Sequence, residues 1–103
     1  MDNELLTLRA QSYAAGLKHD KALRDCSDVL MNGAFPEAEV AVANHTAVAQ
    51  AYGIALLRLA EHLATLARTS EVNDEEARTR KLLDMLDQEI ESVQYRLQLL
   101  KQD

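Results

Sequence analysis

The chain has 103 residues, enough for one domain, and 48% of them are hydrophobic while only 4% are aromatic. Leu (17 residues) and Ala (16 residues) dominate, whereas Gly occurs three times and Pro once. Because Leu and Ala favour helices and β-branched residues are few, the composition excludes an all-β fold and predicts an all-α one. The formal net charge of −6 comes with no basic patch, so we expect no direct binding of nucleic acid.

The N-terminal third predicts two short helices, over about 3–15 and 20–31. Gly16 suits the left-handed position that follows the end of a helix. Asp20 is a good N-cap for the second helix, and Gly33 is a stop signal after it.

Two long helices are predicted in the rest of the chain, over about 36–69 and 74–102. Pro36 suits the first turn of one, and Asn73 is a candidate N-cap for the other. We expect them to form an antiparallel hairpin, with the two short helices along its groove. The fold class is therefore an all-α helical bundle, with a single domain over 1–103.

The last predicted helix carries a short coiled-coil repeat, made by Leu83, Leu86, Ile90, Val93, Leu97 and Leu100. The repeat covers fewer than three heptads, which favours packing on the chain's own third helix. Met85, Tyr95 and Leu99 lie nearly opposite this seam. Three apolar residues on one outer face indicate a contact with a second copy or a partner, so we expect a homodimer.

Two polar features interrupt this apolar pattern. Asp84, Asp87 and Glu91 form an acidic stripe on the last helix, which is either a solvated face or a docking site for a basic partner. The stretch Asn44, His45 and Thr46 forms a polar island in an otherwise apolar helix. A hydrogen-bonded position that fixes helix register is the favoured interpretation. A ligand or proton-transfer site is the alternative, although no carboxylate lies nearby in the sequence.

The spacing of His19, His45 and His62 matches no recognised metal-binding pattern, so we expect no metal, no cofactor and no catalytic residue. Cys26 is the only cysteine, which fits a reducing cytoplasm. Residues 40–57 carry no formal charge and approach the length of a membrane span. Polar residues near their middle favour a buried helix of a cytoplasmic protein without membrane contact.

These observations predict a non-enzymatic protein–protein interaction module that dimerises and binds or regulates a partner protein. The alternative is an acidic inhibitor that occupies the basic site of a nucleic-acid-handling protein. A third hypothesis is a metal or small-ligand enzyme that uses His45 or His62.

Overall fold

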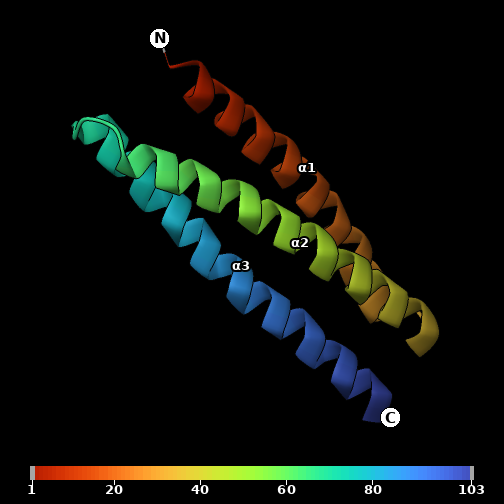
Figure 1. Cartoon of the computed structure of the whole chain (residues 1–103). Helices are drawn as coiled ribbons and strands as arrows, with labels where there is room; N and C mark the ends of the chain where they lie inside the picture. The colour runs from red at the N-terminus through yellow and green to blue at the C-terminus, as the bar shows by residue number, and fades with distance from the viewer. Residues whose placement is uncertain (1, 103) are drawn as a thin grey trace.

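The computed structural model describes residues 2–102 as three helices (Figure 1): α1 (Asn3–Asn32), α2 (Phe35–Ala64) and α3 (Ser70–Gln102). The all-α prediction is confirmed, and the described residues contain no strand. Helix α2 packs along both of the others, whereas α1 and α3 have few contacts with each other. The result is an elongated bundle, 53 × 19 × 15 Å, with one weak seam between α1 and α3.

Helix α1 is continuous where the sequence predicts two short helices, so that prediction is wrong. Gly16 lies inside α1, and a Cβ atom at this position would lie 3.2 Å from Cζ of Tyr52 on α2. A helical glycine costs roughly 0.5–1 kcal/mol relative to alanine. Here the missing side chain leaves room for the Tyr52 ring, so Gly16 serves packing rather than termination. Asp20 is consequently a mid-helix residue and not an N-cap.

The ends of α1 are defined by local hydrogen bonds. Asp2 is the N-cap, and its Oδ1 accepts a hydrogen bond from the backbone N–H of Leu5 at 3.0 Å. At the other end, the N–H of Gly33 donates to the carbonyl of Val29 at 2.7 Å. Pro36 occupies the first turn of α2, as the sequence predicts, because its fixed φ suits that position.

The connection between α2 and α3 lies several residues earlier than predicted, because α2 ends at Ala64 and not at 69, and α3 begins at Ser70 and not at 74. The guanidinium of Arg68 donates to the carbonyl of Leu63 at 2.6 Å and to Oε1 of Glu76 at 2.7 Å. It therefore satisfies the end of α2 and ties it to α3. The hydroxyl of Thr69 accepts from the N–H of Val72 at 3.2 Å, which is an N-cap interaction. Thr69, rather than Asn73, thus caps α3.

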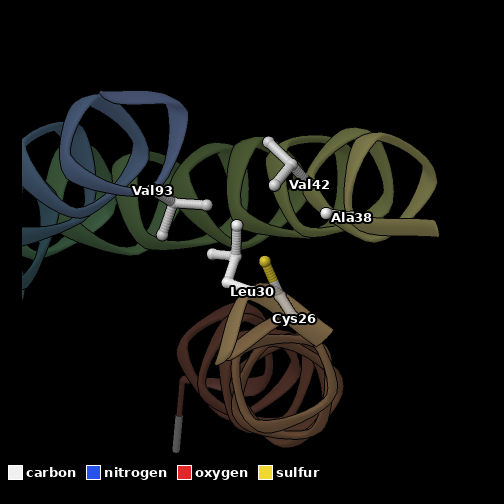
Figure 2. Packing of buried hydrophobic residues seen from close by; sticks show 5 residues of the cluster. All are labelled: Cys26, Leu30, Ala38, Val42 and Val93. Carbon is white, nitrogen blue, oxygen red and sulfur yellow. The ribbon is translucent and has the colours of Figure 1, made fainter. Parts of the chain in front are cut away.

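The hydrophobic core is thin and built from small side chains. Figure 2 shows one of its two clusters, in which residues of α1 point toward α2 and α3; its members are Cys26, Leu30, Ala38, Val42 and Val93. The second cluster contains Ala49, Leu56 and Leu86. Many large apolar side chains remain exposed on all three helices instead.

Helix α2 is the most apolar of the three. Its most apolar 18-residue window has a mean hydropathy of 1.3, and 22% of that window is buried. By length and composition alone it could cross a membrane, although core helices of soluble proteins pass the same test. A large part of the apolar surface of α2 is therefore left uncovered by α1 and α3.

Candidate functional site

A cluster of polar side chains lies where the three helices come together. Nε2 of His19 on α1 lies 2.5 Å from Oε2 of Glu89 on α3. Nε2 of His45 on α2 lies 2.8 Å from the same oxygen. We call these three residues the His–Glu cluster. Each helix contributes one member, so the cluster exists only in the folded bundle.

The His–Glu cluster is largely removed from water. The side chain of His45 is fully buried, that of His19 is 8% exposed and that of Glu89 is 25% exposed. Nδ1 of His19 lies 3.3 Å from Oδ1 of Asp20. Nδ1 of His45 is buried without a hydrogen-bond partner among the described residues. The aromatic ring of Tyr52 lies beside His19, with ring centroids 5.3 Å apart, and burial raises the pKa of the Tyr52 hydroxyl.

The polar island of the sequence contributes only one residue to this cluster. His45 is fully buried, whereas Asn44 is exposed. Thr46 is half-buried, and its hydroxyl oxygen has no hydrogen-bond partner among the described residues. The sequence offers His45 no neighbouring carboxylate, but the fold supplies Glu89 from a position 44 residues further along the chain.

The other two members of the cluster were not predicted as site residues. The predicted helices over 3–15 and 20–31 leave His19 between them. Its spacing to Ala22 and Cys26 could have indicated that His19 is buried, because residues three and seven positions apart share a face of one continuous helix. Glu89 directly precedes Ile90 of the coiled-coil repeat, which places a carboxylate at the edge of the packed seam.

A groove runs along the seam between α2 and α3. It consists of two adjoining pockets of about 410 and 500 Å³, which share Gln50. Small side chains line the α2 wall, among them Ala43, Ala47 and Gly53. Larger apolar side chains line most of the first pocket, among them Ile54, Leu57, Leu83 and Ile90. The second pocket also has polar side chains in its lining, among them Thr46, Gln94 and Gln98. We call this surface the α2–α3 groove.

The rim of the α2–α3 groove is acidic. Glu39 on α2 and Asp87 on α3 line it directly. Asp84 and Glu91 are exposed, three and four positions away from Asp87 on α3. Residues at these spacings share one helix face. The predicted acidic stripe therefore runs beside the groove.

The predicted partner or dimer residues lie elsewhere on α3. Met85, Tyr95 and Leu99 are all exposed, and none of them lines the α2–α3 groove. Their positions on the helical wheel place them on a different side of α3 from Leu83 and Asp87. The protein thus presents two separate apolar surfaces along α3.

Two further polar contacts connect helices that are far apart in sequence. Nε2 of His62 lies 2.7 Å from Oδ2 of Asp2, and this hydrogen bond is the main cause of a lowered pKa of the Asp2 carboxyl group. The guanidinium of Arg9 on α1 donates to Oε1 of Glu75 on α3 at 2.5 Å, which lowers the pKa of the Glu75 carboxyl group. The Arg9–Glu75 ion pair and the His–Glu cluster both span the weak seam between α1 and α3.

Comparisons with protein-family models, curated proteins and solved structures find no match for this chain. Three features of the molecule bear on its function: the His–Glu cluster, the α2–α3 groove and the outer face of α3. None of the three cluster residues lines the groove. The groove and the cluster are therefore separate sites.

Proposed function

We propose that the protein is a non-enzymatic protein–protein interaction module, and that its α2–α3 groove receives a basic amphipathic helix of a partner protein. One observation carries this proposal: the most apolar helix of the chain leaves an open apolar groove along α3. Removing apolar surface from water contributes about 25 cal/mol per Å². A helix that covers the groove would gain this contribution.

The dimensions of the groove support a helical occupant. Its α2 wall runs from Glu39 to Leu57. At 1.5 Å per residue this wall is about 27 Å long, which is about five turns of helix. The small side chains of Ala43, Ala47 and Gly53 allow another helix to approach closely, with its ridge of side chains in the groove.

Charge supports a basic partner rather than a second copy of the groove face. The carboxylates of Glu39 and Asp87 lie on opposite walls, with Asp84 and Glu91 beside them. Two copies that joined through their grooves would bring these like charges together, which disfavours the contact. Lys or Arg residues that flank an apolar helix stripe would complement them. In this proposal the acidic stripe attracts the basic partner to the rim of the groove and does not imitate nucleic acid.

Dimerisation is assigned in this proposal to the other surface of α3, formed by Met85, Tyr95 and Leu99. Their exposure supports this assignment, because apolar residues gathered on one face favour contact with another chain. Light scattering of the purified protein should give the mass of a dimer. The double variant Tyr95→Ser, Leu99→Ser should give a monomer, and a monomeric unmutated protein would remove dimerisation from the proposal.

The proposed location is the cytoplasm. The lone Cys26 is fully buried, and burial is the main cause of the raised pKa of its thiol. A buried thiol of this kind has low reactivity and suits a reducing compartment.

The groove is tested with two synthetic helical peptides of about 18 residues, a length that follows the groove. Both carry a stripe of Leu and Ala; one has Lys at the flanking positions and the other has Glu. Fluorescence anisotropy should show saturable binding of the Lys peptide and at least about tenfold weaker binding of the Glu peptide. Equal binding of both peptides, or binding of neither, would refute the proposed groove chemistry.

Variants on α2 locate the binding surface in the same assay. Ile54→Lys replaces an apolar side chain of the groove with an ammonium group that repels the peptide, so it should abolish binding of the Lys peptide. Val40→Lys is the matched control, because Val40 is exposed on the same helix and does not line the groove. Loss of binding in both variants, or in neither, would place the peptide elsewhere. If the protein bound the Lys peptide only when lipid vesicles were present, the groove would instead be a membrane-associated surface.

A further inference from the structure

We propose that His19, His45 and Glu89 form a zinc-binding site. Their ligand atoms are Nε2 of each histidine and Oε2 of the glutamate, and all lie within 4.8 Å of one another. Two imidazoles and one carboxylate are a donor set that Zn²⁺ takes, with water in the fourth position of its tetrahedron. This inference is independent of the proposed groove, which these residues do not line.

Without a metal, the cluster is held by hydrogen bonds, in which Oε2 of Glu89 accepts from Nε2 of His19 at 2.5 Å and from Nε2 of His45 at 2.8 Å. A Zn²⁺ ion would take the place of these two protons and form coordinate bonds with the same three atoms. Nδ1 of His19 lies 3.3 Å from Oδ1 of Asp20, so this nitrogen can carry the N–H of the imidazole when Nε2 binds the ion.

His45 is the most deeply buried member of the cluster. Its side chain is fully buried and Nδ1 has no hydrogen-bond partner among the described residues, so the hydrogen bond from Nε2 to Glu89 satisfies only half of the imidazole. A coordinate bond from Nε2 to Zn²⁺ is stronger than this hydrogen bond and would offset more of the cost of burying the ring.

The three helices can accommodate the ion. Zinc–ligand bonds of roughly 2.0–2.1 Å in a tetrahedron place the ligand atoms about 3.3 Å apart. The cluster distances of 2.5 and 2.8 Å must therefore widen by less than about 1 Å. Widening the His19–Glu89 distance moves α1 away from α3, and these two helices have few contacts at the level of the backbone. The His45–Glu89 distance needs to widen by only about 0.5 Å, which a change in the side-chain torsions of Glu89 can supply without moving α2 from α3.

The surroundings of the cluster fit a bound metal. Asp20 contacts the outer nitrogen of His19, which is the usual support for a histidine ligand. Glu89 is 25% exposed, so water can reach the fourth coordination position from the solvent side. Bound zinc would join α1, α2 and α3 at one point, and its expected role is to hold the weak seam between α1 and α3 together.

The binding test uses the full chain after removal of metals with a chelator. Titration with Zn²⁺ at neutral pH should show one saturable site per chain by calorimetry, together with a rise in Tm. Titration with Co²⁺ should give the intense visible bands of a four-coordinate ion. Absence of saturable binding of either ion would overturn the proposal.

The three histidines make it possible to locate the ion without any substitution. In NMR spectra of the unmutated protein, Zn²⁺ should shift the imidazole signals of His19 and His45 and leave those of His62 unchanged. Zinc-dependent shifts of His62 alone would show that the ion binds beside Asp2 instead, and would overturn the assignment.

Glu89→Gln is the discriminating variant, because the glutamine oxygen still accepts hydrogen bonds from imidazoles but is a poor zinc ligand. Loss of a residue that only supports a ligand weakens metal binding by about 10–100-fold, so we expect Glu89→Gln to weaken it by at least about 100-fold. His62→Gln is the matched control and should bind Zn²⁺ as the unmutated protein does. Unchanged affinity in a folded Glu89→Gln variant would overturn the proposal.

Discussion

His19 and Glu89 lie 70 positions apart in the sequence, and their side chains meet at 2.5 Å across the seam between α1 and α3. The Arg9–Glu75 ion pair makes a second polar connection between these helices, nearer the N-terminal end of α1. Near the C-terminal end of α1, Cys26 and Leu30 share an apolar cluster with Val93 of α3. The bundle is therefore held by apolar packing on both sides of α2, and by two polar connections and one apolar cluster between α1 and α3.

Removal of the Glu89 carboxylate should destabilise the bundle strongly. In Glu89→Ala, the buried imidazole of His45 loses its acceptor, and a charge-assisted hydrogen bond of this kind is worth about 1.5–3 kcal/mol. The free energy of unfolding from urea titration measures the loss. Glu91→Ala is the matched control, since Glu91 is exposed on the same helix. Equal stability of the two variants would show that the cluster contributes little.

Acid should destabilise the protein through its paired carboxylates. Hydrogen bonds with Arg9 lower the pKa of Glu75, and hydrogen bonds with Arg68 and Arg80 lower that of Glu76, both from an ordinary value of 4.5. A carboxyl group with a lowered pKa in the folded state contributes stability above its ordinary pKa. That contribution is lost as the pH falls through the lowered value. The urea concentration at the unfolding midpoint should therefore decrease as the pH is lowered below the ordinary pKa of 4.5.

The contribution of one ion pair can be separated from this general effect. In Glu75→Gln, the carboxylate that pairs with Arg9 is absent, so stability should depend less steeply on pH in the same acid range. Asp84→Asn removes an exposed carboxylate from the same helix and serves as the control. A pH dependence in Glu75→Gln that equals that of the control would contradict the role of the ion pair.

Gly33 is required by close packing in the turn between α1 and α2. A Cβ atom there would lie 2.7 Å from Cγ1 and 2.8 Å from the carbonyl oxygen of Val29. The backbone must shift to admit it, so Gly33→Ala should lower the free energy of unfolding by at least about 1 kcal/mol. Gly53→Ala is the control, because its Cβ would meet only Leu83 at 3.9 Å. Thermal unfolding of both variants tests the difference.

The thiol of Cys26 should be protected in the folded protein. It is fully buried between α1 and α2, and burial raises its pKa and so lowers the thiolate fraction. Reaction with a disulfide reagent should be slow in buffer and fast in denaturant. Fast labelling of the folded protein would contradict the packing shown in Figure 2.

Helical propensity and apolar spacing predicted the all-α class, but not the continuity of α1. The Gly16 and Asp20 positions have strong local preferences for a helix end. The structure overrides them, because a glycine at position 16 makes room for the Tyr52 ring of another helix. Local preference cannot reveal this contact, since Tyr52 is distant in the sequence. Similarly, Asn73 is a reasonable cap that Thr69 replaces once Arg68 terminates α2.

The candidate site was only partly predictable for the same reason. The sequence identifies His45 as a polar residue in an apolar helix, and in the structure it is a fully buried residue of α2. Its partners His19 and Glu89 come from the two other helices, and only the relative register of the helices brings the three together. The acidic stripe was predicted as a face of one helix, whereas its position beside a groove depends on α2.

Binding of a basic amphipathic helix in the α2–α3 groove can be observed directly. The measurement is an NMR titration of the isotope-labelled protein with the Lys-flanked peptide. We expect the backbone amide signals of Ala47, Gln50 and Gly53 to shift and saturate, while those of exposed residues on α1, such as Tyr13, stay unchanged. Shifts confined to α1 or to the outer face of α3, or no shifts at all, would contradict binding in the groove.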